Sequence, residues 1–223
     1  MKKISEESPY GGMESEAKLL ISLIFLVLLI LFPAYSPMTG TRGDDGTITS
    51  TIFNLYFFII DQTLGIVHEA GHGVCYILPC PEPLMVANGT IFQLLFPSLI
   101  AYYAKRKGEI FYSFVALFFV GFSLYYTSWY ISTSDRGPIV PASESFLGVD
   151  GYHDFHYLLG HLGLLSHYRG ISDLFRVISY AIMIFSVVSM FLNTTTPRHD
   201  DRGGEEGRKK RRRGGVREEE STP

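Results

Sequence analysis

Long uncharged segments limit what this chain can fold into. Apolar runs without Asp, Glu, Lys or Arg recur at residues 19–35, 62–67, 84–104, 110–134 and 177–196. A helix needs about 20 residues to cross roughly 30 Å of hydrocarbon, so most of these runs are typical of transmembrane helices. The composition agrees, since 47% of the residues are hydrophobic. We expect an all-α, polytopic helical membrane protein with about five to six membrane segments.

These segments divide the chain into three predicted parts. Residues 1–16 form a polar N-terminal segment, residues 17–196 a membrane-embedded domain, and residues 197–223 a charged, Gly-rich tail that is predicted to be disordered. The tail contains a basic run from Lys209 to Arg213, which is either a solvated stretch that helps to fix topology or a site for anionic lipid headgroups. We expect an integral, multi-pass protein of the cell membrane and no specific nucleic acid partner.

Proline and turn residues predict where the helices end. The first helix, residues 17–32, should stop at Pro33, and a second helix over residues 52–78 should stop at the sequence PCPEP. The third segment starts with the turn-like pair Asn88-Gly89. This pair predicts a re-entrant or broken entry into the membrane, which is tolerated only where protein or a water-filled cavity covers the backbone.

The second half of the chain should contain two further long helices, residues 110–131 and 171–192. The basic residues 105–107 favour the cytoplasm, and the Tyr- and Trp-rich end of helix 110–131 favours the opposite interface. The histidine-rich stretch 153–168 is predicted to be a partly inserted helix or a short span. If it does not cross, the tail is cytoplasmic, and if it crosses, the tail lies outside.

The predicted second helix carries ionisable residues in its apolar middle. His68, Glu69 and His72 fit the pattern H-E-x-x-H. Residues four apart share one helix face, so both imidazoles can bind one Zn²⁺, and the glutamate can act as general base on a water. The alternative is a buried, hydrogen-bonded cluster without metal. Because ionisable groups are costly in hydrocarbon, we favour the metal site.

A catalytic zinc site needs a third protein ligand and an open position. The acidic and histidine residues near a hydrophobic segment gather in GVDGYHDFHYLLGH, and the candidates are Asp150, His153, Asp154, His156 and His161. Asp154 would open the histidine-rich helix, where a carboxylate suits the helix dipole. His161 lies about 10 Å further along that helix and suits a supporting role. His156 is either such a supporting residue or plain helix surface.

An H-E-x-x-H motif in a transmembrane helix, followed by an aspartate motif, resembles the site-2 protease family of intramembrane zinc metalloproteases. In that family the third ligand is the aspartate of an L-D-G motif, and the sequence VDGYH would make Asp150 that ligand. The blocks HEAGH, NGTIFQLLFPSL and HDFHYLLGHLGLL also resemble a smaller prokaryotic branch of the superfamily, in which His-Asp-aromatic recurs. That likeness favours Asp154, with His153 a third option. The resemblance covers roughly residues 54–165, and the N-x-x-P context before the family's aspartate is not clear.

Further residues are candidates for supporting roles. Asn88 and Gln93 either bind a substrate backbone or an oxyanion, or satisfy a broken backbone. Asp61 lies on the face of His68 and either contacts the site or sits at the membrane edge. We also expect Gly65, Gly71 and Gly73 to be close-packing positions and Cys75 to pack between helices.

These features favour a membrane-embedded zinc-dependent hydrolase that cleaves transmembrane-helix substrates. In this hypothesis His68, His72 and an aspartate hold Zn²⁺, and Glu69 takes the proton of the attacking water. A second hypothesis is hydrolysis of a lipid amide or ester that enters from the bilayer. A third is a metal- or proton-handling membrane protein that uses its histidines as a relay.

Overall fold

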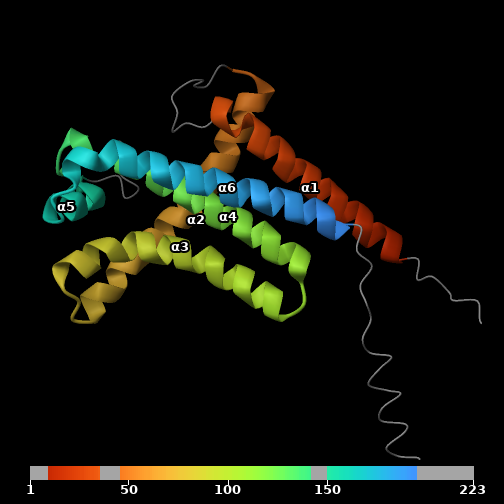
Figure 1. Cartoon of the computed structure of the whole chain (residues 1–223), viewed down its shortest axis with the longest axis horizontal. Helices are drawn as coiled ribbons and strands as arrows, with labels where there is room; N and C mark the ends of the chain where they lie inside the picture. Colours follow the sequence, from red (N-terminus) through yellow and green to blue (C-terminus); the bar gives the residue numbers. More distant parts are fainter. Residues whose placement is uncertain (1–9, 36–45, 142–149, 195–223) are drawn as a thin grey trace, which may run out of the picture.

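The computed structural model describes residues 10–35, 46–141 and 150–194, and almost all of this part is helical (Figure 1). The elements follow one another as α1 (Tyr10–Tyr35), α2 (Ile48–Ile77), α3 (Glu82–Arg106), α4 (Ile110–Ser132), β1 (Ile139–Val140), β2 (Gly151–Tyr152), α5 (Asp154–His161) and α6 (Tyr168–Thr194). There are also two 3₁₀ turns. The first, η1 (Ser134–Arg136), lies between α4 and β1, and the second, η2 (Leu165–His167), lies between α5 and α6.

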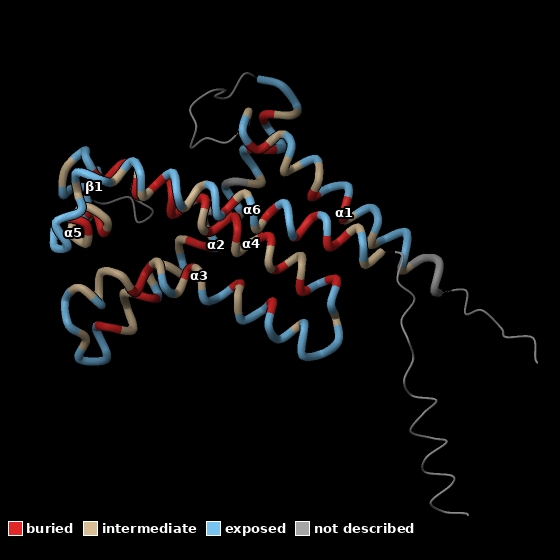
Figure 2. Tube along the Cα trace, viewed as in Figure 1, coloured by how far each residue is buried: buried red, intermediate tan, exposed pale blue. Residues whose placement is uncertain are grey.

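Five of the helices, α1, α2, α3, α4 and α6, are long and apolar enough to cross a membrane. This confirms the predicted helical fold with several candidate membrane segments. Many large apolar side chains on these helices are exposed, as expected for a surface that meets lipid rather than water (Figure 2). The tail and its basic run lie outside the described residues.

Helix α4 lies at the centre of the described part, with α6 and α3 packed against it (Figure 1). Aromatic rings connect α1 to α4, because Phe25 packs against Phe118 with ring centroids 4.7 Å apart and Phe32 against Tyr125 at 4.5 Å. The order of these pairs means that α1 runs parallel to α4. The same rings are part of the buried hydrophobic core, which also includes Met183 and Val187 of α6.

Small residues let α4 and α6 approach closely. A Cβ added at Gly121 would lie 2.7 Å from Cγ of Met183 and 3.0 Å from the carbonyl oxygen of Ser179. Further along, the Ser172 hydroxyl donates a hydrogen bond to the carbonyl oxygen of Ser128 at 2.8 Å. Such contacts are typical of helices that associate within a membrane.

Helix α2 crosses this arrangement obliquely (Figure 1). Its N-terminus is capped by Thr47, whose side chain accepts a hydrogen bond from the backbone N–H of Ser50. Near this start Phe53 stacks on Tyr35, the last residue of α1. The C-terminal half of α2 then packs against the first half of α3. The motif His68–His72 lies in this second half, where α2 meets α3.

The predicted start and end of the first helix were wrong, and so was the predicted break in the third. Helix α1 begins at Tyr10, inside the stretch assigned to a polar segment, and it continues past Pro33 to Tyr35. A proline has a helical φ, so a helix can run on for part of a turn after it. Helix α3 is continuous from Glu82 to Arg106, with no re-entrant break. The pair Asn88-Gly89 fits inside it because both residues are used in contacts with α2.

Helix α5 has only eight residues and spans about 12 Å, which is too short to cross a membrane. Of the two predicted forms for the histidine-rich stretch, this length fits the partly inserted helix better than the short span.

The expected role of Cys75 in helix packing was incomplete. Cys75, at the end of α2, forms a disulfide with Cys80 in the turn before α3, with Cα atoms 5.2 Å apart. Gly73 was wrong as a packing position, since a Cβ there would meet nothing within 4 Å. Gly71 does pack closely, because a Cβ there would lie 2.4 Å from the carbonyl oxygen of Asn88.

Candidate metal centre

The two histidines of the motif point their Nε2 atoms at the same place. His68 and His72 lie one helical turn apart on α2, and their Nε2 atoms are 3.1 Å from each other. The two rings meet edge to face, with centroids 4.8 Å apart. This geometry follows from the spacing of four residues, which places both side chains on the same face of the helix.

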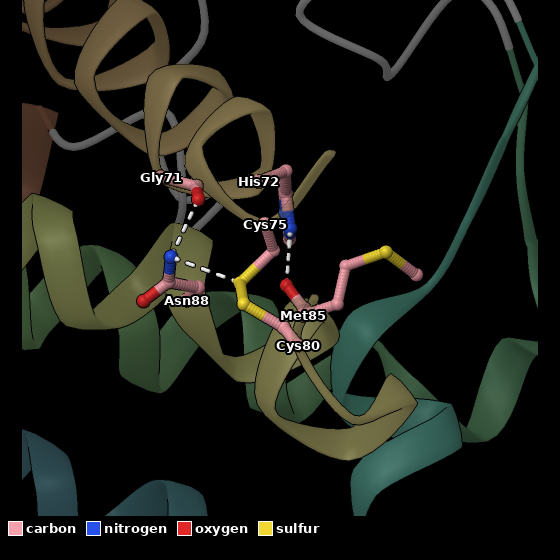
Figure 3. The surroundings of a disulfide bond; sticks show 6 residues. All are labelled: Gly71, His72, Cys75, Cys80, Met85 and Asn88. Carbon is pink, nitrogen blue, oxygen red and sulfur yellow. Dashed lines mark hydrogen bonds between the residues drawn. A yellow bond between two sulfur atoms is a disulfide. The ribbon is translucent and has the colours of Figure 1, made fainter. Parts of the chain in front are cut away.

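Each histidine has its other ring nitrogen occupied by an acceptor. Nδ1 of His72 lies 2.8 Å from the carbonyl oxygen of Met85, and Nδ1 of His68 lies 3.2 Å from Oε1 of Gln93 (Figure 3 shows the first of these). An oxygen acceptor at Nδ1 requires a proton there, so in a neutral ring Nε2 carries the lone pair that a metal ion would use. Such partners are what orient metal-binding histidines in proteins.

Asp154 completes the group from a distant part of the chain. Its Oδ2 lies 3.0 Å from Nε2 of His68 and 3.3 Å from Nε2 of His72. The strands β1 and β2 pair antiparallel and deliver Asp154 as the first residue of α5. Its backbone N–H donates to the phenolic oxygen of Tyr130 at 3.2 Å. The carboxylate is therefore held in place from α4.

The surroundings of Asp154 favour its ionised form. Burial alone raises the pKa of this carboxyl group, but the hydrogen bonds and charges of His68 and His72 outweigh burial. The net result is a pKa below the usual value of an aspartate. A carboxylate rather than a carboxylic acid thus faces the two imidazoles.

His153 is occupied elsewhere, although it is adjacent to Asp154. Its Nδ1 accepts a hydrogen bond from the backbone N–H of His156 and caps α5, and its Nε2 lies 3.0 Å from Oγ1 of Thr133. The ring also stacks on Tyr130 with centroids 4.3 Å apart. Burial lowers the pKa of His153 to about 4, so the ring is neutral at physiological pH. With both nitrogens engaged, His153 orients the start of α5.

Gly89 on α3 leaves the space beside the two histidines open. A Cβ built on this glycine would lie 2.5 Å from Nε2 of His72 and 2.6 Å from Nε2 of His68. No real Cβ makes contacts this short. The absence of a side chain at Gly89 is therefore a requirement of the histidine pair.

The three ligand atoms fit a small metal ion. Tetrahedral coordination with bonds of about 2.0 Å places neighbouring ligand atoms roughly 3.3 Å apart. The three separations in this group are 3.0, 3.1 and 3.3 Å. When both rings are neutral, their Nε2 lone pairs and the carboxylate repel one another, and a cation between them removes that repulsion. The buried group of His68, His72 and Asp154 can thus hold a metal ion.

Glu69 lies next to this group in sequence but on a different side of α2. Its side chain is half-buried. Among the hydrogen bonds and ion pairs within the described residues, none engages its carboxylate. A carboxylate that is not committed to a structural partner is available to interact with a water or a substrate.

The remaining candidates lie at varying distances from the group. Asn88 is buried and donates to the carbonyl oxygen of Gly71 at 2.6 Å, so it connects α3 to α2 (Figure 3). His156 has its Nδ1 2.7 Å from the carbonyl oxygen of Ser134, and the exposed His161 stacks on Tyr157. Neither histidine is brought into the group.

Of the two other acidic candidates, Asp150 is not part of the group. Asp150 is exposed and precedes β2. Asp61 lies in α2, but its side chain is outside the described part of the chain.

Sequence reasoning missed three contributors to this site. The Met85 carbonyl and the Tyr130 hydroxyl could not be identified, because no motif marks them. Gly89 had a usable signal, since a glycine within an apolar helix indicates close approach of another element.

Comparisons with protein-family models, with curated proteins and with solved structures found no match. What the molecule itself defines is a bundle of membrane-type helices with a candidate metal centre. The likeness to site-2 proteases stays a prediction that rests on the motifs.

Proposed function

We propose that this chain is a membrane-embedded zinc-dependent hydrolase, and more narrowly an intramembrane protease that cleaves transmembrane-helix substrates. The observation that supports it most is the arrangement of ligand atoms. Two imidazole Nε2 atoms and one carboxylate oxygen lie within 3.3 Å of one another, and each imidazole is oriented by its own acceptor. Three protein ligands with an open fourth position are typical of catalytic zinc sites.

The residues divide the work of hydrolysis among themselves. His68, His72 and Asp154 would hold the ion. Bound zinc lowers the pKa of water towards 7 and polarises a carbonyl group. The Glu69 carboxylate would accept the proton of the attacking water and pass it to the leaving amine. Gln93, through its contact with His68, keeps that ring in the tautomer that binds metal.

The setting supports a substrate that comes from the membrane. The motif lies in one candidate membrane helix and Gly89 in another. The ligand side chains are only 11–17% exposed, so bulk water has restricted access to them. A transmembrane helix that unwinds locally could present a peptide bond to such a site, and a lipid amide or ester could do so as well.

Metal content of purified variants tests the site. We expect about one zinc per wild-type chain and little in His68→Ala or Asp154→Ala. Asp150→Ala is the matched control, because it removes an exposed aspartate four residues before Asp154 and should leave zinc unchanged. Zinc lost from Asp150→Ala but kept in Asp154→Ala would refute the ligand set.

Activity tests the role of Glu69. Proteoliposomes with wild type or Glu69→Gln would be given a panel of quenched fluorescent transmembrane peptides and, separately, a lipid extract. We expect Glu69→Gln to keep zinc and to lose peptide cleavage. Cleavage of lipids alone would select the lipid hydrolase. Zinc binding without hydrolysis of either, with transport that Glu69→Gln retains, would select the metal-handling protein.

A further inference from the structure

The two ends of the bundle differ in charge. At one end, Lys105, Arg106 and Lys107 close α3. The start of α1 and the end of α6 lie at this same end. Lys18 of α1 lies over the ring of Phe111 at the start of α4, 5.9 Å from its centroid, and the Ser15 hydroxyl donates to the carbonyl oxygen of Thr194, the last residue of α6, at 3.1 Å. All but four of the 19 Lys and Arg residues therefore belong to this end or to the segments attached to it. The exceptions are Arg42, Arg136, Arg169 and Arg176.

The opposite end carries the disulfide and the candidate metal centre. Cys75 follows His72 by less than one helical turn and is bonded to Cys80 in the turn before α3 (Figure 3). From Gly89, beside the two histidines, to Arg106 the helix α3 rises about 25 Å. The metal centre therefore lies close to the disulfide and far from the basic end.

Two independent physical rules assign these ends to sides of a membrane. Positively charged residues near membrane helices accumulate on the cytoplasmic side. Disulfides form and persist on the oxidising, extracytoplasmic side and are rare in the cytosol. Both rules give the same orientation, with the basic end in the cytoplasm and the disulfide outside. The aromatic residues Tyr126 and Trp129 near the end of α4 suit the outer interface.

The directions of the helices agree with this orientation. Helices α1 and α4 run from the basic end to the disulfide end, and α3 and α6 run back. Helix α2 starts beside the end of α1 and ends at the disulfide, so in this orientation it does not cross from one side to the other. Helix α5 is too short to cross. The start of α1 and the end of α6 then both lie on the cytoplasmic side.

From this we propose that the metal centre works at the extracytoplasmic face of the membrane. If the proposed hydrolase function holds, on which this consequence depends, the substrates are membrane-anchored chains whose cleaved segment lies in the outer half of the bilayer or just beyond it. The cytoplasmic half of a substrate helix would be out of reach, since about 25 Å of α3 separates the site from the basic end.

Cysteine labelling in intact bacterial cells tests the orientation. In a background with both native cysteines changed to serine, one reporter is Tyr152→Cys, at a residue that is 82% exposed near the metal centre. The matched reporter is Lys107→Cys, at the basic end. A membrane-impermeant maleimide should label Tyr152→Cys in intact cells and Lys107→Cys only after permeabilisation. The reverse pattern would overturn the proposal.

The unaltered chain provides a second measurement that needs no substitution. It has two cysteines, both in the disulfide. Thiols would be blocked in cells at the moment of lysis, and the chain then reduced and treated with a maleimide polymer. We expect two additions after reduction and none without it, whereas two thiols already blocked in the cells would count against an oxidising location.

Zinc content measured in detergent does not depend on orientation, so it separates the two proposals. A chain that binds zinc but shows the reversed labelling keeps the proposed function and loses the orientation. A chain that shows the expected labelling but binds no zinc keeps the orientation and loses the function.

Discussion

Replacing Gly89 by alanine is the most direct test of how the metal centre is built. The added Cβ would lie 2.5 Å from Nε2 of His72 and 2.6 Å from Nε2 of His68. Ordinary contacts of a Cβ begin at 3.4 Å, so the His72 ring would have to move by about 0.9 Å and the His68 ring by about 0.8 Å, or α3 would have to retreat by a similar distance. The Cβ is fixed to the backbone of α3 and cannot rotate away.

Neither movement is compatible with an intact site. Metal–ligand distances tolerate deviations of about 0.2 Å. A retreat of the rings would also strain the hydrogen bonds of Nδ1 to Met85 and Gln93, which are 2.8 and 3.2 Å long. Loss of such supporting contacts typically reduces metal affinity roughly 10- to 100-fold. We expect Gly89→Ala to lose at least this much, which is about 1.4–2.8 kcal/mol of binding free energy.

The assay is competition for zinc between the purified protein and a chromophoric chelator. Gly73→Ala is the matched control, because it changes a glycine next to His72 where an added Cβ meets nothing within 4 Å. In that control the only expected effect is a gain in helix stability of up to about 1 kcal/mol. Thermal unfolding of the metal-free proteins shows whether Gly89→Ala is folded. A folded Gly89→Ala that binds zinc as tightly as wild type would refute the reasoning.

Three further outcomes follow from the same contacts. Gln93→Leu should lower zinc affinity by roughly 10-fold or more in the chelator assay, because Nδ1–H of His68 loses its acceptor. Unchanged affinity would show that this hydrogen bond does not orient the ring. Tyr130→Phe removes the acceptor of the Asp154 backbone N–H at a cost of about 1 kcal/mol, so zinc affinity should fall a few-fold. An unchanged zinc affinity would mean that other contacts position the carboxylate. Replacing both cysteines by alanine should lower the free energy of unfolding by about 2 kcal/mol, measured by denaturant titration, and chemical reduction of the native chain should reproduce this loss.

The parts of this molecule that depend on local periodicity could be predicted from the sequence. Long uncharged runs predicted the apolar helices, because membrane-spanning helices require such lengths. His68 and His72 could be paired from their spacing alone, since a helix puts residues four apart on one face. The position of α4 between other helices could not be read in this way. Helix α4 packs closely against α6 through small residues such as Gly121 and Ser128. Small residues allow close packing between many pairs of helices, so they do not identify which helices are neighbours.

The choice among the candidates for the third ligand required a contact between residues 86 positions apart. Asp150, His153 and Asp154 are chemically suitable and close in sequence, so residue type cannot separate them. Which of them faces the two imidazoles depends on contacts with residues outside the motif. Because Thr133 and the start of α5 occupy both ring nitrogens of His153, and Tyr130 holds the Asp154 backbone, the carboxylate is the group that turns towards the two imidazoles. The candidate metal centre, with ligand atoms from α2 and α5, is thus specified by the hydrogen bonds of residues outside the ligand group.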